Sequence, residues 1–179
     1  VVDPMRTVED VGAGPNQKNP LPRDLYGPSR RNSMGVDLSI AAERERLTAA
    51  IARLDAETVE AGPIVAGRMR KEGFGAAVAS PADISRTIGR VWSAAPADID
   101  RAFAAAKAAQ PEWDARGGEG RAKVLRAMAD ALEADRERLI AVCVREAGKT
   151  LADAIAEVRE AADFCRYYAY LAERQFAGP

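Results

Sequence analysis

The sequence contains no histidine and has two cysteines, Cys143 and Cys165. The lack of histidine excludes Ser-His and Cys-His nucleophile pairs and removes the commonest ligand of zinc sites. Both cysteines fall on apolar helical stripes, so we expect buried thiols that pack as small hydrophobic side chains. Two cysteines in an intracellular setting do not predict a disulfide framework.

An excess of charge of one sign is also missing, because Lys and Arg number 26 and Asp and Glu number 27. A chain without a basic surplus is not expected to bind nucleic acid through its phosphates. No apolar run approaches the roughly 20 residues of a membrane helix, and the N-terminal stretch lacks the basic-then-apolar pattern of a signal peptide. The expected compartment is therefore the cytoplasm.

Large side chains are scarce as well. Aromatic residues make up 6% of the chain, and alanine supplies much of the hydrophobic fraction of 47%. The length of 179 residues is sufficient for one domain with a core. Because alanine buries little area, we expect that core to be thin.

Proline divides the chain into two predicted parts. Five of the ten prolines lie within the first 28 positions, among glycines and asparagines. Proline is excluded from helix interiors and central strands, so residues 1–36 are predicted to form an extended linker. Residues 37–179 are predicted to form the folded part.

The folded part is predicted to be mostly α-helical with a few short β-strands. Short apolar segments favour strands at Ile64–Ala66, Ala76–Val78 and Thr87–Trp92. Helices are predicted over 39–56, over 96–111 between two prolines, and from 121 to a break near 135. A further helix is predicted to end at Gly148, which suits a C-cap, whereas residues 117–120 are predicted to be a glycine-rich loop.

The longest predicted helix begins at Leu151. An apolar stripe recurs at alternating steps of four and three residues, through Leu151, Ile155, Val158, Ala162, Cys165, Ala169 and Ala172. The opposite face is mixed and carries Asp153, Glu157, Glu160, Phe164, Tyr167 and Leu171. Aromatic side chains beside carboxylates indicate that both faces of this helix contact something.

The two glutamates on the mixed face, Glu157 and Glu160, allow two interpretations. The simpler one is a solvated, ion-paired helix face, on which Arg159 and Asp163 pair with each other. A glutamate that is covered needs a positive partner instead, such as the cationic group of a ligand. The residues alone favour the first interpretation.

Short glycine motifs in the chain are weak signals. Glu146–Thr150 looks like the end of a phosphate-binding loop, but that motif requires glycine where this sequence has Cys143. The flanking residues also have a helical pattern where the motif needs a strand. We therefore predict no nucleotide site there.

Several segments together resemble the aldehyde dehydrogenase superfamily. They are Pro111-Glu-Trp113, Arg145-Glu-Ala-Gly-Lys-Thr150, Ala154-Ile-Ala-Glu-Val-Arg-Glu-Ala161, Asp163-Phe and Arg166-Tyr-Tyr-Ala169. The likeness is greatest to the glutamate-γ-semialdehyde (pyrroline-5-carboxylate) dehydrogenase module of the proline utilization A family. Residues 21–27 (LPRDLYG) and 32–38 (NSMGVDL) are similar to the segment that joins this module to a proline dehydrogenase module.

This resemblance implies an α/β parent fold of the aldehyde dehydrogenase type, of which the chain is the mostly helical N-terminal part. The parent module would oxidise L-glutamate γ-semialdehyde to L-glutamate with NAD, and the neighbouring module would use FAD to oxidise proline. Implied partners are the small-molecule substrate, the remainder of the dehydrogenase module and further copies in a homo-oligomer.

The resemblance also implies what this segment does not contain. The nucleophilic cysteine, the general-base glutamate and most of the NAD-binding fold lie later in such proteins, and no residue here matches them. We therefore assign no catalytic, cofactor-binding or metal-binding residue. The segment alone is expected to be inactive and to bind no cofactor.

Two residues receive a role from the resemblance. Glu160 matches the helix position that faces the aldehyde pocket and holds the α-ammonium group of the substrate, and Phe164 would lie by the pocket wall. A different class of function, a non-enzymatic helical adaptor with a flexible proline-rich arm, is the alternative.

Overall fold

The computed structural model describes residues 19–177, so the first half of the predicted linker lies outside the described residues. The described chain begins with two short 3₁₀ helices, η1 (Pro22–Asp24) and η2 (Gly27–Ser29). The remaining elements are α2 (Ala41–Asp55), β1 (Val59–Ala61), β2 (Ile64–Val65), β3 (Arg68–Met69), β4 (Ala76–Ser80), β5 (Asp83–Val91), α3 (Pro96–Ala115), α4 (Gly117–Ala134), α5 (Arg136–Ala147) and α6 (Leu151–Gln175). The predicted mostly helical architecture with a few short strands is confirmed.

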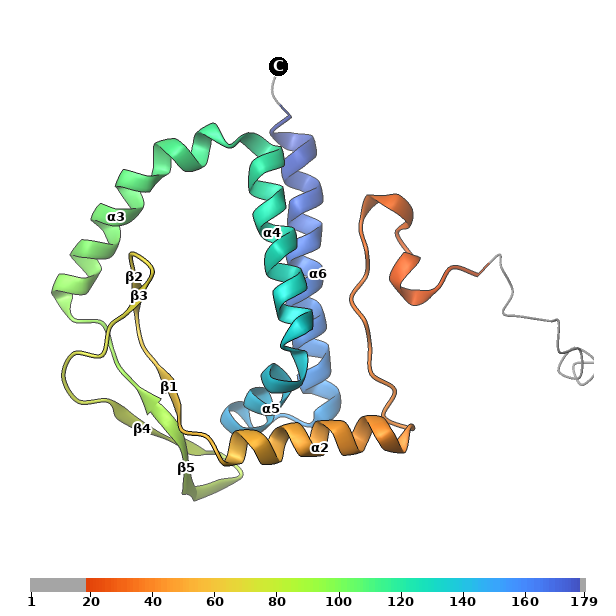
Figure 1. Cartoon of the computed structure of the whole chain (residues 1–179), viewed down its shortest axis with the longest axis vertical. Coiled ribbons are helices and arrows are strands. Elements are labelled where there is room, and N and C mark those ends of the chain that lie inside the picture. Colours follow the sequence, from red (N-terminus) through yellow and green to blue (C-terminus); the bar gives the residue numbers. More distant parts are fainter. Residues whose placement is uncertain (1–18, 178–179) are drawn as a thin grey trace, which may run out of the picture.

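Helices α4 and α6 lie side by side in opposite directions, and the short helix α5 connects them at one end (Figure 1). The turn after α5 depends on Gly148, whose left-handed φ of 64° confirms the predicted C-cap. At the other end of the pair, a Cβ on Gly118 would meet the Ala172 carbonyl oxygen at 2.3 Å. Glycine at that position therefore permits the close approach of α4 to the end of α6.

The strands form a small sheet around β5. Strand β1 pairs with β5 in parallel and β4 pairs with it antiparallel, while β2 and β3 make a separate two-stranded hairpin. The three predicted strand segments overlap with β2, β4 and β5, although β5 begins four residues before the predicted segment. The sequence did not predict β1 and β3, which are two or three residues long.

The core lies where α2, α5 and α6 meet. Its buried side chains include Leu47 of α2, Ile140 of α5, and Ile155 and Val158 of α6. Many of the other buried positions are alanines, among them Ala122, Ala129, Ala141, Ala154, Ala162 and Ala169. The expectation of a thin, alanine-rich core is confirmed.

Helix α3 stands apart from the α4/α6 pair in Figure 1. Its buried residue is Asp98, which accepts from the Ala95 amide and forms ion pairs with Arg70 and Arg101. Ile99 and Phe103 form an apolar face on this helix, and they are 49% and 74% exposed. The described residues therefore cover that face only in part, and the ion pairs of Asp98 hold the N-terminal end of α3.

Two sequence predictions near α3 are wrong. Pro111 does not end the helix, which continues to Ala115 with the proline inside it. Proline removes the donor that would reach the Lys107 carbonyl, and both residues are exposed, so water can take that place. The predicted glycine-rich loop, residues 117–120, is instead the first turn of α4, and the chain changes direction at Arg116 and Gly117.

Candidate functional site

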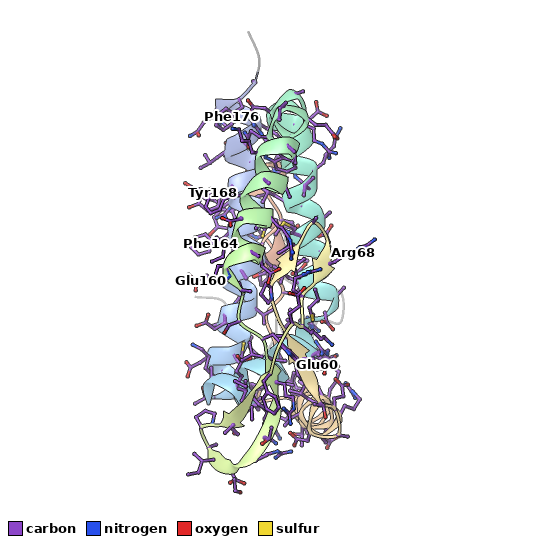
Figure 2. All side chains as sticks on the ribbon, turned by 90° about the vertical axis from the view of Figure 1, so that its left-hand side faces the viewer. Glu60, Arg68, Glu160, Phe164, Tyr168 and Phe176 are labelled. Carbon is purple, nitrogen blue, oxygen red and sulfur yellow. The ribbon has the colours of Figure 1, made fainter. Side chains whose placement is uncertain are left out.

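The buried apolar stripe of α6, with Ile155 and Val158, is confirmed. The mixed face, which the sequence predicted to contact something as well, leaves Glu160 and Phe164 exposed among the described residues. Figure 2 shows Glu160, Phe164, Tyr168 and Phe176 along one side of this helix. Phe164 stacks against Tyr168 with ring centroids 6.1 Å apart. An acidic residue and a row of aromatic side chains therefore share one surface.

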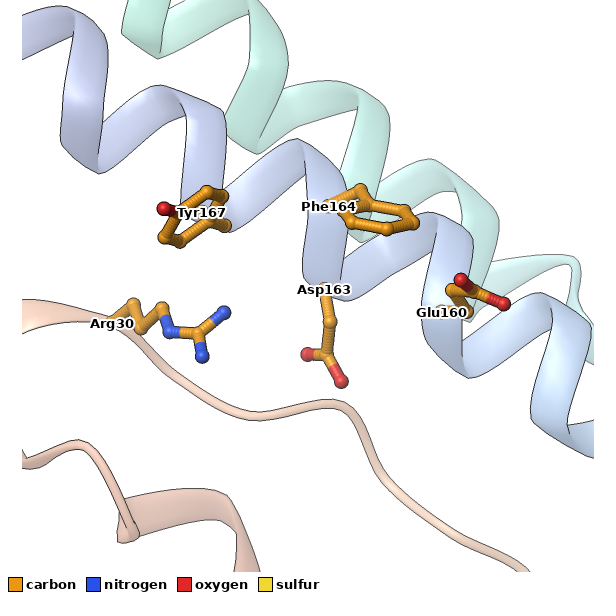
Figure 3. Close-up of a pocket in the computed structure, with 5 residues that line it drawn as sticks. All are labelled: Arg30, Glu160, Asp163, Phe164 and Tyr167. Carbon is orange, nitrogen blue, oxygen red and sulfur yellow. The ribbon is translucent and has the colours of Figure 1, made fainter.

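A shallow groove of about 360 Å³ lies at the middle of α6 and is lined by Arg30, Glu160, Asp163, Phe164 and Tyr167 (Figure 3). Four of these residues come from one helix, on which they are spaced three or four positions apart or adjacent. The fifth comes from the segment after η2. The structure thus brings Glu160 and Phe164, the two residues singled out from the sequence, into one groove.

The two carboxylates of the groove have different surroundings. Asp163 accepts a hydrogen bond from the Ser33 amide and another from the Ser33 hydroxyl, each at 2.7 Å. Within residues 19–177, no hydrogen bond or ion pair reaches the Glu160 carboxylate at comparable distance. Glu160 is therefore the groove carboxylate that is available to a ligand cation.

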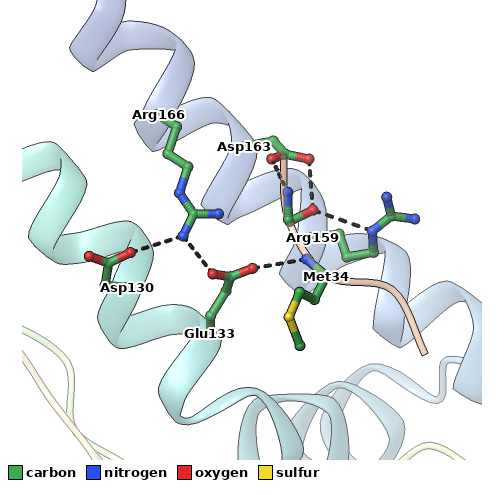
Figure 4. A network of polar contacts seen from close by, with 7 residues as sticks. Met34, Asp130, Glu133, Arg159, Asp163 and Arg166 are labelled. Atoms are coloured by element: carbon green, nitrogen blue, oxygen red, sulfur yellow. Dashed lines mark hydrogen bonds and ion pairs between the residues drawn. The ribbon is translucent and has the colours of Figure 1, made fainter. Parts of the chain in front are cut away.

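The sequence suggested that Arg159 and Asp163 pair directly. The structure places the Ser33 hydroxyl between them instead, where it donates to Asp163 and accepts from the Arg159 Nε at 3.3 Å (Figure 4). Ser33 lies about 130 positions earlier in the chain, so helical spacing within α6 gave no indication of this contact.

Glu157, one turn before Glu160, behaves as an ordinary surface residue. Its carboxylate pairs with Lys149 Nζ at 2.6 Å, and the hydrogen bond raises the pKa of that lysine. For Glu157, the simpler interpretation of an ion-paired surface holds.

The residues that resembled a phosphate-binding loop, Glu146–Thr150, form a junction between two helices. Gly148 caps α5 and Thr150 caps α6.

Arg166 is a structural residue that sequence reasoning missed. Its side chain is 6% exposed, and its Nη2 donates to Asp130 at 2.9 Å and to Glu133 at 2.5 Å (Figure 4). The hydrogen bond to Glu133 raises the pKa of Arg166. Its position one residue after the stripe member Cys165 was the available signal, because an arginine beside an apolar stripe requires buried anionic partners.

The two cysteines are less buried than the sequence predicted. Both thiols are half-buried. Burial raises the pKa of the Cys143 thiol above its usual value, which disfavours the nucleophilic thiolate. Residues 19–177 contain no group of three or more His, Cys, Asp or Glu side chains that could hold a metal ion. Within the same residues, none of the helices has an apolar stretch that would span a bilayer.

Comparison with known proteins identifies the class. Residues 69–178, more than half of the chain, match the aldehyde dehydrogenase family. The chain therefore belongs to the aldehyde dehydrogenase family, as the sequence resemblance predicted.

The relatives of this chain include PutA proteins and 1-pyrroline-5-carboxylate dehydrogenases. The chain is 37% identical over 188 residues to the bifunctional protein PutA of Escherichia coli (strain K12), covering 99% of this chain and 14% of that protein. It is 30% identical over 141 residues to 1-pyrroline-5-carboxylate dehydrogenase of Staphylococcus epidermidis, covering 78% of this chain and 27% of that protein. The chain thus spans about a seventh of the length of the first relative and about a quarter of the length of the second.

Solved structures agree with these relatives. PutA from Bdellovibrio bacteriovorus superimposes with a TM-score of 0.78 at 30% identity, covering 82% of this chain and 16% of that one. The 1-pyrroline-5-carboxylate dehydrogenase from Thermus with bound NAD gives a TM-score of 0.77 at 27% identity, covering 82% and 28%. The arrangement of helices and strands described above is therefore that of an aldehyde dehydrogenase segment.

Proposed function

We propose that this chain is the N-terminal part of a dehydrogenase module that oxidises L-glutamate γ-semialdehyde to L-glutamate with NAD. The support comes from the names of the relatives, since water opens the ring of 1-pyrroline-5-carboxylate to the same semialdehyde. We include in the proposal a neighbouring proline dehydrogenase module that uses FAD, because PutA relatives are described as bifunctional.

The observation that carries the proposal is the carboxylate of Glu160, which no residue in the described part of the chain pairs with, in a groove beside Phe164. The neighbouring acidic residues are already engaged, Asp163 by Ser33 and Glu157 by Lys149. An α-ammonium group entering the groove would therefore find its carboxylate partner at Glu160. A charge-assisted hydrogen bond of this kind is stronger than a neutral one and fixes the orientation of the bound molecule.

The role of this chain is then to hold one end of the substrate. Glu160 would bind the α-ammonium group, and Phe164 would pack against the aliphatic part of the substrate from half-exposed positions on α6. NAD, when bound, accepts the hydride that leaves the aldehyde carbon. The reacting groups themselves are expected outside this chain, and no residue here is assigned to the cofactor.

The exposed apolar face of α3 supports the proposal that further chain covers this segment. Ile99 and Phe103 lie on that face, and exposed apolar patches on one side of a protein commonly mark contact surfaces. We propose that the remainder of the dehydrogenase module packs there. Homo-oligomerisation of the complete protein stays a prediction from the family resemblance.

The proposed function is tested by NADH formation from glutamate γ-semialdehyde. The complete polypeptide that carries this chain should form NADH, and the 179-residue chain alone should form none. NADH formation by the chain alone that is lost in the Cys165→Ala variant would refute the proposal that the reacting groups lie outside this chain. Full-length protein that is inactive on the semialdehyde would favour the helical adaptor instead.

A further inference from the structure

Residues 30–36, which we call the strap, are extended and docked on the helices rather than free. Ser33 in the middle of the strap is 1% exposed and Asn32 beside it is also buried. Upstream, the Asn32 amide donates to the Arg23 carbonyl and its side chain donates to the Pro22 carbonyl. The strap is therefore tied to the turn before it as well as to the helices behind it.

A clamp of hydrogen bonds fastens the strap to α6 and α4 (Figure 4). Both donors of Ser33 go to the Asp163 carboxylate at 2.7 Å, and the next amide, that of Met34, donates to Glu133 at 2.9 Å. Hydrogen bonds to ionised carboxylates are the stronger class, and here three of them act on two consecutive residues. Removing the Asp163 charge should therefore release the centre of the strap.

The clamp has a consequence for the groove, because Arg30 at the start of the strap is one of its lining residues (Figure 3). The Arg30 guanidinium lies 3.7 Å from the centre of the Tyr26 ring and 5.4 Å from that of Tyr167. No carboxylate within residues 19–177 forms an ion pair with it. The groove thus has an anion, Glu160, on α6 and a cation, Arg30, on the strap.

A lining of both signs fits a zwitterionic ligand. Glutamate γ-semialdehyde carries an ammonium and a carboxylate on one carbon atom, whereas a simple aldehyde carries neither. Charges of opposite sign on the two sides of a site discriminate between ligands through electrostatic complementarity.

We propose that Asp163 is a positioning residue, which clamps the strap through Ser33 and so holds Arg30 in the groove as a specificity-determining residue facing the substrate carboxylate. This inference rests on the proposed function of Glu160. The two proposals depend on different residues. The inference about the strap is tested by variants of Asp163, Ser33 and Arg30, whereas the proposed function of Glu160 is tested by variants of Glu160 itself.

The test uses the complete enzyme that carries this chain, with five variants. Asp163→Asn and Ser33→Ala weaken the clamp, Arg30→Gln removes the cation and leaves the clamp, and Glu157→Ala is the control on the same helix. Ser33→Thr, which retains the hydroxyl, serves as the conservative rescue. Each protein is measured for amide hydrogen exchange at Ser33 and Met34, and for kcat and KM with glutamate γ-semialdehyde and with propanal.

We expect Asp163→Asn to speed amide exchange at Ser33 about 10- to 100-fold, with a smaller effect for Ser33→Ala and none for Arg30→Gln. Asp163→Asn and Arg30→Gln should both raise KM for the semialdehyde about 10-fold, and neither should change KM for propanal. Ser33→Thr and Glu157→Ala should resemble the unmodified enzyme.

The inference is overturned if Asp163→Asn loosens the strap without changing KM for the semialdehyde, or if Arg30→Gln leaves that KM unchanged. Unchanged amide exchange in Asp163→Asn would refute the clamp itself. Failure of the proposed function has a different signature, because the unmodified enzyme would then show no preference for the semialdehyde over propanal.

Discussion

The amide and the hydroxyl of Ser33 both donate to the carboxylate of Asp163 at 2.7 Å. This contact separates the roles of two acidic residues that share one groove and lie three positions apart on α6. Both carboxylate oxygens of Asp163 accept hydrogen bonds from the strap, whereas no residue within 19–177 pairs with Glu160, which is left for a ligand. The sequence predicted Arg159 as the partner of Asp163 and did not indicate the contact with Ser33.

The buried arginine of α6 gives the first prediction. Replacing Arg166 by Ala should lower the free energy of unfolding by about 3–5 kcal/mol, because Glu133, whose side chain is only 17% exposed, then loses its cation. Lys123→Ala is the matched control, since Lys123 and its partner Glu119 are both exposed, and it should have no measurable effect. Urea unfolding of the complete protein measures both. Equal, small effects of the two substitutions would contradict the assignment.

The second prediction concerns acid stability. Burial opposes the ionisation of Glu133, but the hydrogen bonds from Arg166 and from the Met34 amide outweigh it, so its pKa lies below the usual 4.5. A depressed folded-state pKa stabilises the protein above the unfolded value, and this stabilisation is lost as the pH falls through the folded value. The stability difference between the unmodified protein and Glu133→Gln should therefore shrink as the pH is lowered below about 4.5. A difference that is constant from pH 7 to pH 3 would show that Glu133 titrates normally.

The helical phase of α6 was predictable because its 25 residues repeat one apolar period many times. The strap contact was not, because it joins Ser33 to a helix far along the chain. Strand β1 was missed for a related reason, since Val59–Ala61 is a strand only through its pairing with β5. The prediction from Pro111 was wrong because α3 continues through the proline, at an exposed position where water can reach the freed carbonyl.

The same distinction applies to the candidate site. Glu160 and Phe164 follow from periodicity and family resemblance, which are properties of one continuous stretch. Arg30 comes from the predicted linker, and nothing local in the proline-rich segment indicates that it reaches α6. Long-range contacts of this kind depend on how the chain folds back, which periodicity does not encode.

A third prediction concerns association of the chain on its own. Phe103 and Ile99 present an uncovered apolar face on α3, so the 179-residue chain should self-associate in solution. Phe103→Asp should reduce the apparent mass in light scattering, whereas Ala108→Asp, at an exposed position on the other side of the same helix, should not. A compact monomer with cooperative thermal unfolding would contradict this prediction.

The central claim is that Glu160 holds the α-ammonium group of an amino-acid semialdehyde. The most direct measurement is the steady-state kinetics of Glu160→Ala and Glu157→Ala, in the complete enzyme, on glutamate γ-semialdehyde and on propanal. A charge-assisted hydrogen bond contributes about 1.5–3 kcal/mol, so Glu160→Ala should lower kcat/KM for the semialdehyde about 10- to 100-fold. It should scarcely affect propanal, and Glu157→Ala, which breaks an exposed pair with Lys149, should affect neither substrate. Equal losses on both aldehydes for Glu160→Ala would show that the residue is structural and would contradict the assignment.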